Sequence, residues 1–76
     1  MTEKTIKLHQ NEEFITLQSL LKVTGIISTG GMVKVFLLEN EVLVNGENEN
    51  RRGRKLYDGD KIQVANKLFT IKKNDC

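Results

Sequence analysis

The segment Val42-Leu43-Val44-Asn45-Gly46 constrains the fold of this chain more than any other part of the sequence. A run of β-branched and large apolar residues favours a strand, and an Asn-Gly pair directly after a strand is a strong signal for a tight hairpin turn. The sequence therefore predicts that residues 42–44 belong to a sheet and that the chain reverses at Asn45-Gly46.

A dense basic run follows this hairpin. Four of the five residues from Arg51 to Lys55 are basic, and they include all three arginines of the chain. The planar, forked donors of arginine fit phosphate. Basic loop residues are often only solvated surface, but the clustering of the arginines favours phosphate binding. Because the formal net charge of the 76 residues is only +2, we expect a local contact with a polyanion rather than a general basic field.

The first part of the chain carries the pattern of a strand followed by a helix. Ile6 and Leu8 alternate with polar residues, which is typical of a strand with one buried face. Thr16 is expected to cap a helix, and Gly25 to end it, because glycine tolerates the left-handed conformation after a helix. The apolar stripe of this helix consists of Leu17, Leu20 and Leu21.

A second helix is expected to begin with Ser28 or Thr29 as its cap and to end near Glu39-Asn40. Lys34 should point outward. The pair Gly30-Gly31 has two open interpretations, namely a phosphate approaching backbone N–H groups or a tight entry turn. The apolar face of this helix is expected to comprise Val33, Phe36 and Leu37, widened by Met32, Val35 and Leu38.

The remaining apolar residues predict further strands. Strands are expected near residues 56–57, 62–64 and 69–71, with turns at 58–60 and 66–67, and residues 47–55 show no period. The predicted fold is therefore α+β, with two short helices packed on a small, mainly antiparallel sheet. The predicted core consists of Leu17, Leu20, Leu21, Val33, Phe36, Leu37, Val42, Val44, Ile62, Val64, Phe69 and Ile71.

The residues that an enzyme or a metal site requires are missing. His9 is the only histidine and is expected on the first strand, and Cys76 is the only cysteine. One of each cannot build a zinc site or a disulfide, so we expect a protein of the reducing cytoplasm without catalysis, cofactor or metal. No apolar run approaches the roughly 18 residues of a membrane span, and no signal-type segment opens the chain.

Five segments together resemble a known family, the S-four RNA-binding domain, also called the alpha-L motif. The similarity is strongest to its small stand-alone members, the YaaA/YbcJ group, which share the Gly-rich helix start, the Val-x-Val-Asn hairpin and the Arg-Arg-Gly-Arg-Lys-Leu run. The resemblance covers about residues 16–64 of one expected domain, 1–76. The matching segments are 16–22, 25–28, 30–34, 42–46 and 59–60.

This resemblance implies binding of structured ribosomal or transfer RNA, in ribosome assembly or translation, by a monomer that can associate with ribosomal particles. Larger members carry a Ser-Arg pair at the start of the second helix, where this chain has Ser28-Thr29-Gly30-Gly31, so one expected phosphate contact is missing. The RNA-facing residues carried over from the family are Ser28, Thr29, Gly30, Lys34, Asn45, Arg51, Arg52, Arg54 and Lys55.

Two other classes of protein compete with this interpretation. The segment Val44-Asn45-Gly46-Glu47 also looks like the ubiquitin-like β-grasp group of sulfur carriers and interaction modules, but such carriers need a C-terminal Gly-Gly and this sequence ends in Asn74-Asp75-Cys76. A small enzyme lacks support because no catalytic cluster is visible. The basic run decides the choice in favour of RNA binding.

Overall fold

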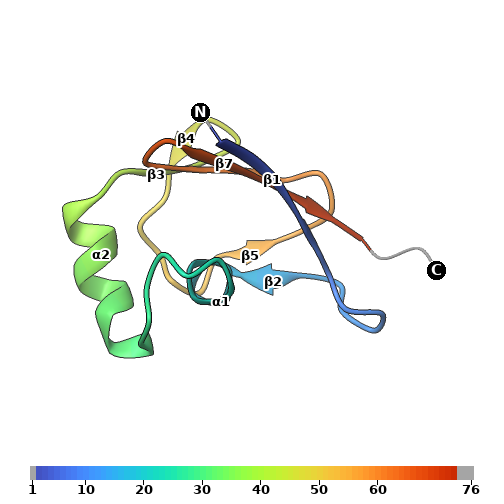
Figure 1. Cartoon of the computed structure of the whole chain (residues 1–76), viewed down its shortest axis with the longest axis horizontal. Helices are drawn as coiled ribbons and strands as arrows, with labels where there is room; N and C mark the ends of the chain where they lie inside the picture. Colours follow the sequence, from blue (N-terminus) through green and yellow to red (C-terminus); the bar gives the residue numbers. More distant parts are fainter. Residues whose placement is uncertain (1, 74–76) are drawn as a thin grey trace.

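The computed structural model describes residues 2–73, so Cys76 lies outside the described residues. Figure 1 shows a sheet on one side of the molecule, with α1 beneath it and α2 at one end. In chain order the elements are β1 (Thr2–Lys7), β2 (Ile15–Thr16), α1 (Leu17–Val23), the 3-10 helix η1 (Gly30–Met32), α2 (Val33–Glu39), β3 (Val42–Val44), β4 (Glu47–Asn48), β5 (Lys55–Leu56), β6 (Lys61–Val64) and β7 (Lys67–Lys72).

The main sheet has five strands in the order β1-β7-β6-β3-β4. The edge strand β1 runs parallel to β7, and the other neighbours are antiparallel. The α+β fold predicted from the sequence is confirmed. The hairpin at Asn45-Gly46 is confirmed too, since both residues have positive φ, 54° and 86°, as a type I′ turn requires.

The first helix begins and ends where the sequence predicts. Thr16 has extended backbone, and its Oγ1 accepts a hydrogen bond from the N–H of Ser19 at 3.4 Å. Gly25, with φ 80°, follows the last turn and donates its N–H to the carbonyl of Lys22. Thr24 strengthens this end, because its hydroxyl donates to the carbonyl of Leu20 at 2.8 Å.

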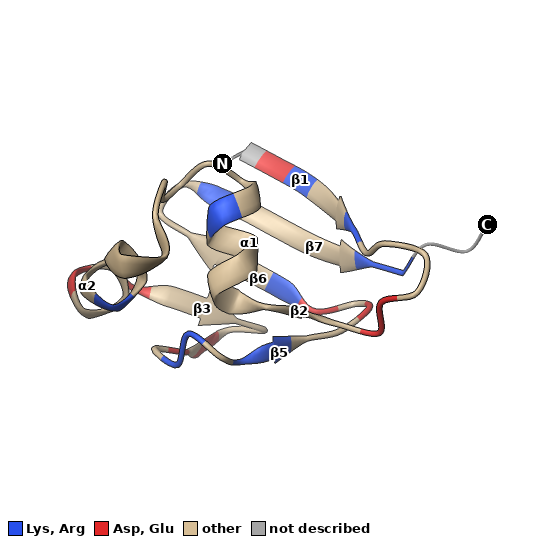
Figure 2. Cartoon of the chain, turned by 90° about the horizontal axis from the view of Figure 1, so that it is seen from below, with Lys and Arg blue, Asp and Glu red and all other residues tan. Residues whose placement is uncertain are grey.

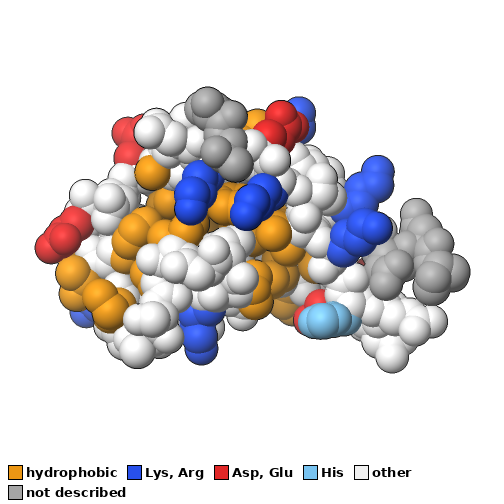
Figure 3. Space-filling model, viewed as in Figure 1, with side chains coloured by type: hydrophobic (Ala, Val, Ile, Leu, Met, Phe, Trp, Pro, Cys, Tyr) orange, Lys and Arg blue, Asp and Glu red, His pale blue; other side chains and the backbone are white. Residues whose placement is uncertain are grey.

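The second helix differs from its prediction in two ways. Its first turn is the 3-10 helix η1, and Thr29 stands before that turn without a side-chain capping bond. The expected widening of the apolar face was wrong, because Met32, Val35 and Leu38 are exposed. Figure 3 shows hydrophobic side chains as orange atoms on the surface over α2. With only seven residues, α2 turns one narrow stripe, Val33 and Leu37, toward the core.

The core lies between the main sheet and the helices. Eleven of its twelve predicted members are buried, and Phe36 is only half-buried against them. Leu8, Ile27 and Leu56 are also buried, although the predicted core did not include them. Leu8 extends the ladder beyond β1, since its N–H donates to the carbonyl of Lys72 at 2.9 Å.

The strand predicted near residues 56–57 lies one residue earlier in the structure and belongs to a separate two-stranded sheet. It is β5, and it pairs antiparallel with β2, with Thr16 opposite Lys55. The expected turn at 66–67 is also shifted by one residue, because Ala65 and Asn66 form it and Lys67 opens β7. Ala65 has φ 55°, a conformation that glycine or asparagine adopts more readily, which is why the sequence did not indicate the turn there.

Within residues 2–73, no helix has the length and apolar character needed to cross a membrane.

The observed orientation of α2 predicts that two neighbouring leucines contribute very differently to the free energy of unfolding. Leu37 is 7% exposed and Leu38 is 73% exposed. Replacing Leu37 with Ala should lower the free energy of unfolding by about 2–5 kcal/mol, because it leaves a cavity in the core. Replacing Leu38 with Ala should change it by no more than about 0.5 kcal/mol. Chemical denaturation of both variants measures this, and equal losses would contradict the facing.

Candidate functional site

The basic run forms most of the connection from β4 to β5. We call residues 49–55 the basic loop. Figure 1 shows this segment descending from the sheet between α2 and α1, and the end of α2 borders the same hollow as Asn48 and Asn50. In Figure 2 the blue segments of the loop and of β5 follow one another along one edge of the molecule. The loop therefore brings its cations together on the surface beside the second helix.

The register of the hairpin directs Glu49 toward the interior. The two-residue turn pairs Val44 with Glu47 and Leu43 with Asn48, and the Glu49 N–H donates to the carbonyl of Val42 at 2.8 Å. Residues paired across strands share a face of the sheet. Glu49 thus lies on the same face as Val42 and Val44. It is only 6% exposed, whereas Glu47, which is paired with Val44, is exposed.

The Glu49 carboxylate is held by two arginines of the loop. Its Oε2 accepts hydrogen bonds from Nε and from the backbone N–H of Arg51, both at 3.0 Å. Its Oε1 accepts bonds from Nη1 of Arg54 at 2.6 Å and from Nη2 of Arg51 at 3.3 Å. Hydrogen bonding from Arg51 is the main cause that lowers the pKa of Glu49 from 4.5 to about 2, against the opposing effect of burial. The carboxylate therefore stays charged and fixes the loop from the inside.

The other side of the basic loop is fixed by the start of α1. The first N–H groups of a helix have no partner within the helix. Here the N–H of Leu17 donates to the carbonyl of Arg54 at 2.9 Å, and the N–H of Gln18 donates to the carbonyl of Arg52 at 3.0 Å. The loop backbone is thus bonded on both sides before any ligand binds.

These contacts divide the basic residues into two pairs. Arg51 and Arg54 are bonded to Glu49, although the Arg51 side chain is 75% exposed. Arg52 and Lys55 are exposed and form no ion pair with an acidic residue of segment 2–73. Their charge is the part of the loop that remains available to an anion.

The other predicted contact residues lie before α2, on α2 and at the turn between β3 and β4. Ser28 and Thr29 are exposed before η1, Gly30 is the exposed first residue of η1, and Lys34 is exposed on the first turn of α2. Asn45 has a role within the fold, because its Nδ2 donates to Asp60 at 3.1 Å and its Oδ1 accepts the N–H of Lys61 at 2.9 Å. A contact between Asn45 and RNA stays a prediction.

A groove of about 450 Å³ opens beside the loop. The groove is lined by Arg51, Gly53, Arg54, Lys55 and Tyr57. Phe14 is half-buried and packs against Tyr57 with their ring centroids 5.8 Å apart. Nζ of Lys55 lies 5.0 Å from the centroid of Phe14. The groove therefore combines cations with an aromatic ring.

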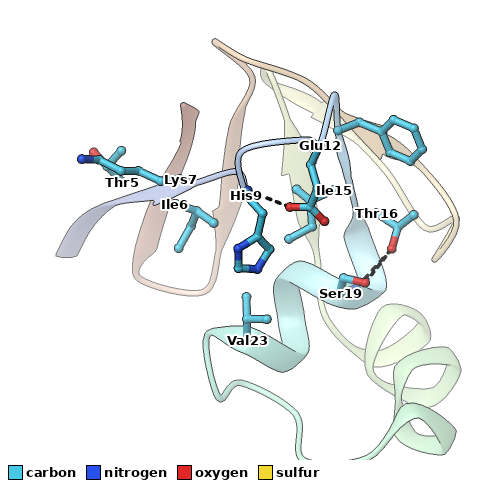
Figure 4. A pocket seen from close by; sticks show the side chains of 10 residues that line it. Thr5, Ile6, Lys7, His9, Glu12, Ile15, Thr16, Ser19 and Val23 are labelled. Atoms are coloured by element: carbon cyan, nitrogen blue, oxygen red, sulfur yellow. Dashed lines mark hydrogen bonds between the residues drawn. The ribbon is translucent and has the colours of Figure 1, made fainter. Parts of the chain in front are cut away.

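A second hollow, of about 650 Å³, lies between β1, the loop after it, and α1. In Figure 4 the imidazole of His9 points toward Val23, and the His9 backbone N–H donates to Glu12 at 2.8 Å. His9 follows β1 rather than standing on it, so its predicted place on the first strand was wrong. Among the described residues, no group of three or more His, Cys, Asp and Glu side chains is placed to hold a metal ion.

Glu49 is not among the site residues predicted from the sequence, although a signal for it was present. Once Asn45-Gly46 is accepted as a two-residue turn, counting outward pairs residue 42 with residue 49 and places a carboxylate opposite a core valine. A charged residue at an inward position requires partners of opposite charge, and the nearest ones in the sequence are the arginines.

Two comparisons relate the chain to known proteins. A model of the S4 domain matches residues 3–72. The chain is also 58% identical over 52 residues to the "Probable ribosome maturation protein RlbA" of Bacillus subtilis, in an alignment that covers 68% of this chain and 73% of that protein. The match to the S4 domain includes β1 and β7, so it extends beyond residues 16–64.

Removing the charge of Glu49 should destabilise the chain in a pH-dependent way. At pH 7, Glu49→Gln should lower the free energy of unfolding by about 1–3 kcal/mol, because the arginines lose a charged acceptor. Since the folded pKa is about 2 against 4.5, the stability from this carboxylate is fully present above about pH 4.5 and is lost as the pH falls through about 2. Thermal unfolding from pH 7 to 2 should therefore show parent and variant converging.

The matched control is Glu47→Gln, an exposed glutamate two residues earlier on the same hairpin. This control should melt like the parent throughout the series. A Glu49→Gln variant that matches the parent at pH 7, or that differs from it equally at every pH, would contradict the role given to the carboxylate.

Proposed function

Because the chain belongs to the S4 domain family, we propose that it is an RNA-binding protein without catalytic activity that acts in ribosome assembly or translation. The name of the relative from Bacillus subtilis supports the connection with ribosomes. Membership in the S4 family also supports RNA binding over the alternative of a β-grasp sulfur carrier or interaction module. In this proposal residues 1–76 supply one RNA-binding domain, which works in the cytoplasm as a monomer on structured ribosomal or transfer RNA.

The observation that carries this proposal is the fixed basic loop. Glu49 and the start of α1 hold the loop backbone, while Arg52 and Lys55 are exposed. Ordering a flexible loop on binding costs conformational free energy, and a loop that is already ordered avoids that cost. Phosphate groups of RNA are the ligand that fits a fixed pair of exposed cations with two further arginines beside them.

The contact surface extends from the loop to the start of α2. Lys34 adds a cation, and the exposed residues Ser28, Thr29 and Gly30 add hydroxyl and backbone groups that can reach phosphate or ribose oxygens. Such a surface recognises the shape of a folded RNA and its backbone more than its base sequence. Arg51 and Arg54 have a second role beside their contact with RNA, because they position the loop through Glu49.

The salt dependence of RNA affinity tests this assignment. Each phosphate neutralised contributes roughly 0.7–0.9 to the slope of log affinity against log salt. Replacing Arg52 or Lys55 with Ala should flatten the slope by about that amount for each variant and weaken binding to different structured RNAs similarly. Affinity for a structured ribosomal RNA fragment should be measured across a salt series, with circular dichroism to check folding.

Lys72→Ala is the control, because Lys72 is an exposed cation at the end of β7, and β6 and β3 lie between β7 and β4 in the main sheet. Its salt slope should equal that of the parent. Folded Arg52→Ala and Lys55→Ala variants that also keep the parent slope would refute the loop as the phosphate contact.

A further inference from the structure

We propose that the groove beside the basic loop binds one unpaired nucleotide of the RNA, with its base stacked on Tyr57 and its phosphate held by the neighbouring cations. This inference rests on the proposed function and adds a class of substrate to it, namely RNA with a bulged or looped-out nucleotide. The residues that carry it are Tyr57, Phe14, Gly53, Arg54 and Lys55.

Tyr57 is an exposed aromatic residue held in a fixed position. It is 48% exposed, although it borders a well-packed small sheet. Its backbone N–H donates to the Asp60 carboxylate at 2.8 Å, and its carbonyl accepts the N–H of Asp60 at 3.0 Å. Phe14 supports its ring in a tilted pair, with an interplanar angle of 53°. The exposed part of a ring held in this way can stack on a base without first being ordered.

The groove supplies cations next to this ring. Lys55 and Arg54 line it together with Tyr57. Nζ of Lys55 is held over the ring of Phe14 at 5.0 Å, so the charge stays beside the aromatic pair. Aromatic rings combined with a cationic groove are the means by which proteins bind unpaired nucleotides, because every base has a face that can stack and every nucleotide has a phosphate. A duplex region would present only phosphates here, because its bases are already stacked on one another.

Gly53 leaves the groove open. The backbone φ angle of Gly53 is not positive, so the backbone conformation there does not require glycine. A Cβ atom built at this position meets nothing within 4 Å. A side chain is therefore sterically possible at residue 53 and would extend into the space that we assign to the nucleotide. Gly53→Leu is consequently a variant that should fold and block the groove.

The fluorescence of Tyr57 gives a direct test in the unmodified chain, because Tyr57 is the only tyrosine and the chain has no tryptophan. The two probes are an RNA hairpin with one bulged nucleotide in its stem and the same hairpin without the bulge. We expect the bulged RNA to quench the tyrosine emission and the fully paired RNA to leave it nearly unchanged. The paired hairpin also controls for light absorption by RNA.

Variants then separate stacking from charge. Tyr57→Leu should weaken binding of the bulged RNA about 5- to 150-fold, the range for losing one stacked base, without changing the salt slope, since no phosphate contact is removed. Tyr57→Phe should retain the parent affinity because its ring can still stack. Gly53→Leu should weaken the bulged RNA more than the paired one. Circular dichroism verifies the folding of each variant.

The outcomes distinguish this inference from the proposed function. If both hairpins bind with the salt dependence expected of Arg52 and Lys55, but neither quenches the emission of the parent chain, the nucleotide site is refuted and RNA binding by the loop stands. Since this readout needs no substitution, it decides the matter even if Tyr57→Leu fails to fold. If the parent binds neither hairpin nor the ribosomal RNA fragment, the proposed function is overturned and the nucleotide site with it.

Discussion

The buried carboxylate of Glu49 is the constraint on which the site depends. A charge in this position costs free energy unless donors surround it, and Arg51 and Arg54 provide those donors at distances of 2.6 to 3.3 Å. The chain between these arginines has little freedom, since Arg52 and Gly53 form a tight turn closed by the bond from the Arg54 N–H to the Arg51 carbonyl at 3.2 Å. One ionic cluster thus determines where four cations and the adjacent groove lie.

This arrangement explains why a basic run on a nearly neutral chain can act as a defined binding surface. Arg51 and Arg54 form ion pairs with Glu49, and these ion pairs hold the part of the loop that carries Arg52 and Lys55. The start of α1 contributes as well, because its first N–H groups bond to loop carbonyls rather than to water. The proposed binding surface and the hydrophobic core are therefore connected through the helix that carries Leu17, Leu20 and Leu21.

The features that could be predicted from the sequence depend on local chemistry. The Asn45-Gly46 turn, the Thr16 cap and the glycine after α1 follow from residue preferences that act within a few positions. The pairing of β2 with β5 could not be predicted, because it joins two-residue strands far apart in the sequence. The buried face of α2 was harder to predict than that of α1, because apolar residues occur all around this short helix. Only tertiary packing determines that Val33 and Leu37 are the buried ones. The basic residues of the candidate site could be identified from the sequence. The sequence did not show that Arg51 and Arg54 bind Glu49 while Arg52 and Lys55 do not, because this depends on where Glu49 lies in the fold.

Hydrogen exchange at the N–H groups of Leu17 and Gln18 tests the central claim most directly. As the first residues of α1 they have no acceptor within the helix, and in the RNA-free chain their acceptors are the carbonyls of Arg54 and Arg52. If the basic loop is fixed before RNA binds, both amides should exchange in the RNA-free chain as slowly as amides of the main sheet. Exchange at the rate of an unstructured peptide, with protection only after RNA is added, would show that the loop becomes ordered on binding and would contradict this account.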